Sequence, residues 1–325
     1  MAKQLVIVLP ILLLLFNSIT EVAEGTESNS SLNLIVFGDS YVDTGNFIIS
    51  PSYKLPYGIT FPGKPAGRFS DGRVLTNYVA SFVNIKSPAP YLLRNSSKLQ
   101  YGINFAYGGA GVFNTLVPVP NMAIQIDKFE ELIKQNAYTK TNLQSSIALV
   151  SFVGNDYFKF LFVNGGNVKN VGVFTASLIK QLSLNLKRIQ SLGISKIAIE
   201  LMEPMGCLPI ATQTYEKCNE TLNMVAMNHN QLLLQAVDKL NKEIGTPVFV
   251  TLDLYTAFLS TIASMQKNHD GMNPLQPCCV GVLFCEIILL CDKPELTFFW
   301  DALHPSQNGW YGVYQMLQSS IPQRV

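Results

Sequence analysis

Short apolar runs alternate along the chain with longer segments in which apolar residues recur at helical spacing. Residues 34–37 form one apolar run, which stops at Gly38, and residues 147–153 form another, which stops at Gly154. A continuous apolar run of this length is typical of a strand that is buried on both faces, as in a parallel sheet. The two runs therefore predict two central strands, each followed directly by a glycine.

Helical spacing is clearest in three segments. The first covers residues 75–83 and follows a polar turn, in which Ser70 or Asp71 is the expected N-cap. The other two helices each stop at a glycine, which is common just beyond a helix C-terminus, and an apolar strand follows each of them. The expected pairs are helix 173–192 with strand 196–201, and helix 222–244 with strand 247–252.

The alternation of helices with short buried strands predicts the fold class. Parallel strands are joined by crossover connections, and the helices in those connections cover both faces of the sheet. The chain contains no internal repeat, no low-complexity tract and no Pro/Gly-rich linker long enough to divide it. We therefore expect a single three-layer α/β/α domain with a central parallel sheet and large loop insertions.

The N-terminal segment has the pattern of a targeting signal. Lys3 precedes an apolar run over residues 5–16, which Pro10 interrupts, and small and polar residues follow. A retained membrane anchor is the alternative, but a bilayer-spanning helix needs about 20 apolar residues. We expect a signal peptide over residues 1–24, a mature domain over residues 25–325, and a secreted, extracellular protein without a stable membrane anchor.

Composition narrows the class of partner. The chain has 325 residues, of which 48% are hydrophobic, so it can bury a sizeable core. Its 23 basic and 22 acidic side chains leave a formal net charge of +1, and they form no basic stripe. A nucleic-acid partner is therefore not expected.

Cysteines and sequons agree with an oxidising compartment. The six cysteines lie in the second half of the chain, and an even number suggests disulfides; a metal cluster is the alternative, but no histidine stands nearby at ligand spacing. Cys207 and Cys218 flank a short loop that they can close. The pairing stays open for Cys278, Cys279, Cys285 and Cys291. Sequons that predict N-glycans lie at Asn29, Asn95 and Asn219.

Polar residues that could take part in catalysis follow the two central strands. Ser40 comes just after the first strand, and Asn155 comes just after the second. In an open parallel sheet, ligands bind beyond the carboxyl ends of the strands. Taken alone, a serine there is often only an N-cap and an asparagine only a turn former.

An acid–base pair near the C-terminus changes that interpretation. Asp301 and His304 are three residues apart, which brings the carboxylate to the imidazole Nδ1 and leaves Nε2 to face a hydroxyl. A serine needs such a base because an alcohol is a poor nucleophile. Of the other two histidines, His229 lies in a helical pattern and His269 in a polar stretch, so we expect both to be structural.

A glycine-rich segment supplies candidate donors for an oxyanion. Residues 108–111 contain three glycines, whose backbone N–H groups no Cβ would hinder. The segment is not a dinucleotide loop, since the G-x-G-x-x-G pattern is incomplete. The Asn155 side chain offers a further N–H donor.

The ordered set of these segments resembles the GDSL-type (SGNH) esterase/lipase family, and in particular its secreted plant members. G-x-S-x-G, the nucleophile elbow of α/β-hydrolases, does not occur. The resemblance covers nearly the whole mature chain and implies the flavodoxin-like fold of SGNH hydrolases. Its blocks are residues 37–46, 67–73, 104–111, 204–207 and 229–230.

The resemblance implies a role for each candidate residue. Ser40 would be the nucleophile and, through its N–H, an oxyanion donor. Gly109 would donate its backbone N–H and Asn155 its side-chain N–H to the same oxyanion. His304 would be the general base and then the general acid, and Asp301 would orient it. No metal or other cofactor is implied.

The expected activity is hydrolysis of a carboxylic ester through an acyl-enzyme. Loops 42–67 and 112–121 are rich in apolar residues and proline, which suits an acyl lipid; an O-acetyl ester on a cell-wall glycan or a specialised metabolite fits equally well. A non-hydrolytic secreted binding protein is the alternative class. Tyr41 replaces the family's leucine and Tyr107 its serine, and we expect Tyr41 to narrow or redirect the acyl pocket. A small-molecule or lipid ester is the expected partner of a monomeric protein.

Overall fold

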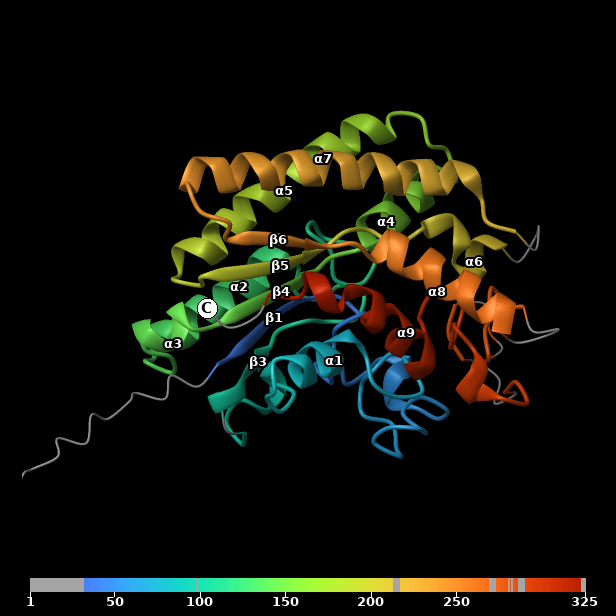
Figure 1. Ribbon diagram of the computed structural model, residues 1–325, viewed down its shortest axis with the longest axis horizontal. Coiled ribbons are helices and arrows are strands. Elements are labelled where there is room, and N and C mark those ends of the chain that lie inside the picture. Colours follow the sequence, from blue (N-terminus) through green and yellow to red (C-terminus); the bar gives the residue numbers. More distant parts are fainter. Residues whose placement is uncertain are drawn as a thin grey trace, which may run out of the picture.

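The chain folds around one sheet of six parallel strands in the order β2-β3-β1-β4-β5-β6 (Figure 1). The computed structural model describes residues 32–97, 99–212, 217–268, 273–279, 281, 283–285 and 290–322. The strands are β1 (Leu34–Gly38), β2 (Ala89–Pro90), β3 (Gly102–Asn104), β4 (Ile147–Ser151), β5 (Lys196–Glu200) and β6 (Phe249–Leu252).

Helices cover both faces of this sheet (Figure 1). They are α1 (Leu75–Phe82), α2 (Met122–Lys134), α3 (Lys140–Gln144), α4 (Asn155–Val163), α5 (Val171–Ser191), α6 (Pro209–Thr212), α7 (Glu220–Ile244), α8 (Leu254–Asn268) and α9 (Gln307–Leu317). Short 3₁₀ turns lie at Pro51–Tyr53, Tyr91–Leu93, Leu99–Tyr101, Met205–Cys207, Pro294–Leu296 and Gln318–Ser320.

The two helical layers follow from the alternation of side chains along each strand. Ile35 and Phe37 of β1 belong to a core cluster with α2, α5 and α7, whereas Leu34 and Val36 belong to a second cluster with α1, α8 and α9. Both faces of β1 are therefore buried, as its continuous apolar run predicts. The single three-layer α/β/α domain is confirmed.

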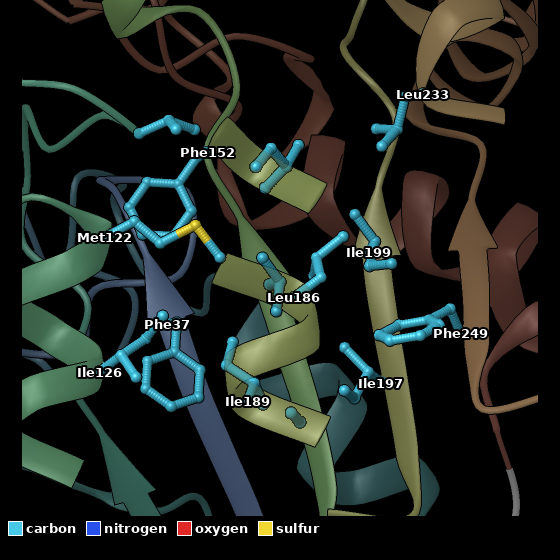
Figure 2. Close-up of a cluster of buried hydrophobic side chains, with 14 of the residues drawn as sticks. Phe37, Met122, Ile126, Phe152, Leu186, Ile189, Ile197, Ile199, Leu233 and Phe249 are labelled. Carbon is cyan, nitrogen blue, oxygen red and sulfur yellow. The ribbon is translucent and has the colours of Figure 1, made fainter. Parts of the chain in front are cut away.

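The larger cluster forms a rigid support beneath the end of β1 (Figure 2). The Phe37 ring stacks on Phe105 at 5.4 Å between centroids and meets the edge of Phe129 at 5.7 Å. Met122 and Ile126 of α2 complete the packing around Phe37 and are also fully buried. Each such side chain contributes about 1.5–3 kcal/mol by leaving water, so the strand that precedes Ser40 has little freedom to move.

The strand order places the topological switch point of the sheet at the carboxyl ends of β1 and β4. Without the two-residue β2, the strands numbered by their order in the chain are arranged 2-1-3-4-5, which is the flavodoxin-like order. The chain leaves β1 toward β3 on one side and then reaches β4 on the other, so the connections diverge between these neighbours. Gly38 pairs with Ser151 at that edge. Segments that follow these two residues therefore meet at the topological switch point.

Most predicted elements agree with the structure to within a few residues, with one correction. Helix α5 ends before Gly193, which adopts φ +103°, and α7 ends at Gly245 with φ +79°. Neither Ser70 nor Asp71 caps α1, because Val74 is its N-cap. The Asp71 carboxylate instead accepts a hydrogen bond at 2.7 Å from the backbone N–H of the first residue of α9, a partner distant in sequence.

Three disulfides join all six cysteines. The predicted Cys207–Cys218 bridge is confirmed. The pairings left open are Cys278–Cys291 and Cys279–Cys285. Within the described residues, no helix is both long and apolar enough to span a bilayer. The expected signal peptide, Asn29 and His269 lie outside the described residues.

Candidate active site

The backbone that leads to Ser40 is held on both sides. A Cβ on Gly38 would lie 2.5 Å from the carbonyl oxygen of Ser151, so only glycine fits this close approach to β4. The next residue, Asp39, donates its backbone N–H to the same carbonyl at 2.9 Å. The buried Gln125 amide accepts from the N–H of Gly38 and donates to its C=O, both at 2.9 Å. Ser40 therefore follows a strand end whose backbone is fixed by hydrogen bonds on both sides.

Asp301 and His304 lie in a tight turn and not in a helix. The backbone N–H of Trp300 donates to the carbonyl of His304 at 2.7 Å and closes the turn. Asp301 Oδ1 accepts from the backbone N–H groups of Leu303 and His304, each at 2.8 Å. This local turn brings the imidazole Nδ1 to 2.8 Å from Oδ1 and 2.9 Å from Oδ2.

Folding brings Ser40 to this pair across 264 positions of sequence. Its Oγ lies 2.8 Å from Nε2 of His304. Ser40 is 8% exposed, His304 3% and Asp301 0%. Since the carboxylate accepts the Nδ1 proton, Nε2 is free to accept the hydroxyl proton. The geometry is that of a serine with its base and a carboxylate that orients the base.

Two backbone N–H groups near Ser40 have no protein acceptor. In the described part of the chain, neither the N–H of Ser40 nor that of Gly109 donates a hydrogen bond. Gly109 adopts φ +83°, and a Cβ there would lie 2.8 Å from Val117 Cγ2. A glycine is therefore required at this position, and its amide remains available to a ligand.

Asn155 contacts both of the segments that carry these free backbone N–H groups. As the first residue of α4, it donates from Nδ2 to the carbonyl of Ala110 at 3.0 Å and, over a longer 3.4 Å, to Asp39 Oδ2. Ala110 follows Gly109, and Asp39 precedes Ser40. The side chain of Asn155 thus lies between the two segments whose backbone N–H groups are free, and its role as a third oxyanion donor stays a prediction.

The comparisons with known proteins agree on one family. The chain matches the GDSL-like lipase/acylhydrolase family over residues 34–310. It belongs to this family. The GDSL esterase/lipase At5g03610 of Arabidopsis thaliana is 46% identical to it, over 95% of this chain and 93% of that protein. The GDSL esterase/lipase At3g09930 of the same plant is 44% identical, over 89% and 88%. Acetylajmalan esterase 2 of Rauvolfia serpentina is 28% identical, over 88% and 89%.

The family confirms the predicted class of enzyme. GDSL esterases/lipases are serine hydrolases of carboxylic esters, and the resemblance to plant members is borne out by relatives that match most of this chain. Among the described residues of this GDSL chain, no group of three or more His, Cys, Asp or Glu side chains is arranged to hold a metal ion.

Tyr41, which replaces the leucine of the GDSL motif, packs in edge geometry against the His304 ring at 5.9 Å between centroids. Only 5% of the residue is exposed, and its ring meets the edge of Trp310 at 5.0 Å between centroids. The hydroxyl donates to the carbonyl of Leu303 at 3.0 Å. Tyr41 lies in the core beside the Asp301–His304 turn, and its narrowing or redirecting of the acyl pocket stays a prediction.

Asp39, which directly precedes Ser40 in this GDSL site, is a buried carboxylate. Asp39 accepts from the backbone N–H groups of Tyr41 at 3.0 Å and Val153 at 2.9 Å, so its carboxylate joins the turn after β1 to the segment after β4. Burial raises the pKa of Asp39 well above its usual value, and the negative charges of Glu203 and Asp156 add to this, while the two backbone hydrogen bonds oppose it.

Glu200 and Glu203 are further buried acids that sequence reasoning missed. Glu200 accepts from the Ser151 hydroxyl at 2.6 Å, and burial raises its pKa well above the usual value. Burial likewise raises the pKa of Glu203 to about 7. One carboxylate oxygen of each residue has no hydrogen-bond partner in the part of the chain that the structure describes. No motif marks either residue, because each acquires its environment only from packing.

The remaining predicted residues lie apart from the dyad. His229 is buried, its Nδ1 lies 2.9 Å from the Tyr157 hydroxyl, and burial lowers its pKa to about 3, so it is a neutral core residue. Of the sequons, Asn95 is exposed, whereas Asn219 is half-buried and caps α7 by accepting from the N–H of Leu222 at 3.2 Å.

Proposed function

We propose that Ser40 is the nucleophile in the hydrolysis of a carboxylic ester through an acyl-enzyme. The observation that carries the proposal is the buried contact of 2.8 Å between Ser40 Oγ and His304 Nε2, with Asp301 on the other ring nitrogen. A protein that only binds an ester has no chemical need for this arrangement. The contact therefore favours hydrolysis over the alternative of a non-hydrolytic binding protein.

In the first half-reaction, His304 Nε2 takes the proton of Ser40 Oγ as Oγ bonds to the ester carbonyl carbon. The carbonyl oxygen becomes negative, and the N–H groups of Ser40, Gly109 and Asn155 are the proposed donors to it. Collapse breaks the bond from carbon to the alcohol oxygen, and the alcohol leaves with the proton from His304.

In the second half-reaction, a water molecule gives a proton to His304 and attacks the acyl carbon. The bond from that carbon to Ser40 Oγ then breaks, Oγ regains a proton from His304, and the carboxylic acid leaves. Asp301 stabilises the imidazolium in both halves because its carboxylate holds the Nδ1–H.

We propose an acyl ester as the substrate of a secreted, monomeric enzyme. Ile48, Ile49 and Leu55 expose apolar side chains on the loop between β1 and α1, which suits an acyl chain. An O-acetyl ester is the second candidate, since one relative is named an acetylajmalan esterase. The leader-like N-terminus and three disulfides support secretion, and Asn95 and Asn219 are the proposed glycan sites within the described chain.

Ser40→Ala tests the nucleophile, with Ser191→Ala as the control, since Ser191 is exposed at the end of α5. Both variants and the wild type are assayed on p-nitrophenyl esters from acetyl to palmitoyl and on acetylated polysaccharide, and are labelled with a fluorophosphonate. We expect Ser40→Ala to lose hydrolysis by at least about 1,000-fold and to escape labelling, while Ser191→Ala behaves as wild type. A folded Ser40→Ala protein with wild-type turnover would overturn the assignment.

A further inference from the structure

The two oxygens of the Asp301 carboxylate are anchored differently. Oδ1 accepts from the backbone N–H groups of Leu303 and His304, which belong to the same turn. Oδ2 accepts from the hydroxyl of Tyr57 at 2.7 Å, across 244 positions of sequence. Among the described residues, Tyr57 is the only hydrogen-bond partner of this carboxylate from outside the turn. Its hydroxyl therefore connects the dyad to the loop between β1 and α1.

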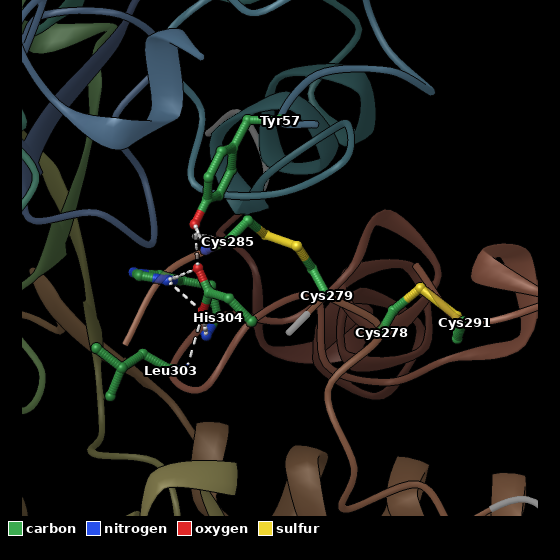
Figure 3. Close-up of a disulfide and its surroundings, with 8 residues drawn as sticks. Tyr57, Cys278, Cys279, Cys285, Cys291, Leu303 and His304 are labelled. Carbon is green, nitrogen blue, oxygen red and sulfur yellow. Dashed lines mark hydrogen bonds and ion pairs between the residues drawn. A yellow bond between two sulfur atoms is a disulfide. The ribbon is translucent and has the colours of Figure 1, made fainter. Parts of the chain in front are cut away.

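The surroundings of Tyr57 fix the direction of this hydrogen bond. The backbone N–H of Cys285 donates to the Tyr57 hydroxyl oxygen at 3.2 Å. Because an ionised carboxylate can only accept, the hydroxyl proton is directed at Asp301. Figure 3 shows Tyr57 reaching from its loop toward the turn that holds His304, with Cys285 beside the hydroxyl.

The Tyr57 ring is also fixed. Tyr57 is 1% exposed, and its ring meets Phe69 at 6.3 Å and Trp300 at 6.5 Å between centroids, both in edge geometry. Cys285, which donates to its hydroxyl, is joined by a disulfide to Cys279. A buried donor with its ring and its oxygen both held has little orientational freedom to lose when it binds a charge.

We propose that Tyr57 is a positioning residue that holds the Asp301 carboxylate in the orientation from which it stabilises the His304 imidazolium. This inference rests on the proposed function. Without the Tyr57 hydroxyl, Oδ2 keeps only the shared contact with Nδ1. The carboxylate is then anchored only through Oδ1, by the two backbone N–H groups of its own turn, and its plane can tilt away from the imidazole. The imidazolium that forms in each half-reaction then loses part of its stabilisation, which slows the chemical steps and leaves substrate binding unchanged.

Tyr57→Phe tests the proposal because it removes the hydroxyl and keeps the ring. Tyr53→Phe is the matched control: Tyr53 lies on the same loop and donates to the carbonyl of Gly45 at 2.8 Å, so it also loses one hydrogen bond, but away from the dyad. For Tyr57→Phe we expect kcat on a p-nitrophenyl ester to fall by about 10-fold with KM unchanged, and fluorophosphonate labelling to slow in parallel. Tyr53→Phe should retain wild-type values.

Two further measurements separate positioning from a general structural effect. If Tyr57 acts through Asp301, Tyr57→Phe costs about 10-fold in the wild-type background but little in Asp301→Asn, because the charged acceptor is gone. The acid limb of the kcat/KM profile should also move to lower pH in Tyr57→Phe, since an imidazolium that is less well stabilised by Asp301 releases its proton more readily. His304 and Tyr57 are the titratable side chains that hydrogen-bond to this carboxylate in the described chain.

The outcomes distinguish this inference from the proposed function. If the wild type neither hydrolyses esters nor labels at Ser40, the proposed function fails and this inference fails with it. If the wild type is active and Tyr57→Phe keeps its kcat and its acid limb, only the role of Tyr57 is overturned. Equal losses in the wild-type and Asp301→Asn backgrounds, or an equal loss in Tyr53→Phe, would likewise reject positioning through Asp301.

Discussion

We expect the buried carboxyl of Glu203 to make folding stability depend on pH, and its replacement by glutamine to remove its share of that dependence. The residue is 1% exposed, and its Oε2 has no hydrogen-bond partner within the described residues. Burial raises its pKa to about 7, although a hydrogen bond from its own backbone acts in the opposite direction. Glutamine keeps the shape of the side chain and carries no charge at any pH.

Proton linkage sets the sign and the size of the effect of Glu203 on the free energy of unfolding. In the unfolded chain the Glu203 carboxyl titrates near its model value of 4.5, so between that pH and about 7 the folded state holds more protons than the unfolded state. Stability therefore falls as pH rises through this window. At 1.36 kcal/mol per pKa unit, Glu203 lowers the free energy of unfolding by about 2–3 kcal/mol between pH 5 and pH 8.

Urea unfolding at pH 5 and pH 8, followed by the fluorescence of the buried Trp300 and Trp310, measures this difference. In Glu203→Gln the loss of stability from pH 5 to pH 8 should be smaller than in the wild type by about 2 kcal/mol. Glu131→Gln, at an exposed position in α2, should retain the wild-type difference. If Glu203→Gln shows the same loss as the wild type, burial does not perturb this carboxyl and the reasoning fails.

Two other outcomes are expected. Asn155→Ala should lower kcat by about 100-fold and change KM little in steady-state assays, because an oxyanion donor acts mainly in the transition state; a change in KM alone would assign Asn155 to substrate binding. In the denatured, unreduced protein a thiol reagent should find no free sulfhydryl, and after reduction it should find six, since all six cysteines are paired; free thiols before reduction would contradict the pairing.

The sequence by itself determined the features that depend on neighbouring residues. The apolar run that ends at Gly38 identified a strand buried on both faces, and its position alone placed Ser40 at a carboxyl end of the sheet. The spacing of Asp301 and His304 predicted their contact because a turn of three residues is local. Gly193, just beyond α5, was equally predictable, since its left-handed conformation is a backbone requirement at that position.

Only the tertiary structure decided which distant side chains meet. Tyr57 is 244 positions from Asp301, and no periodicity links a loop tyrosine to a C-terminal turn. Asp71 has the sequence signature of an N-cap, yet its carboxylate binds the start of α9 because packing brings that helix end to it. The altered pKa of Glu203 depends in the same way on burial, which many distant residues create together. Local patterns specify backbone conformation, whereas long-range packing sets the surroundings of a side chain, and in this protein those surroundings complete the site.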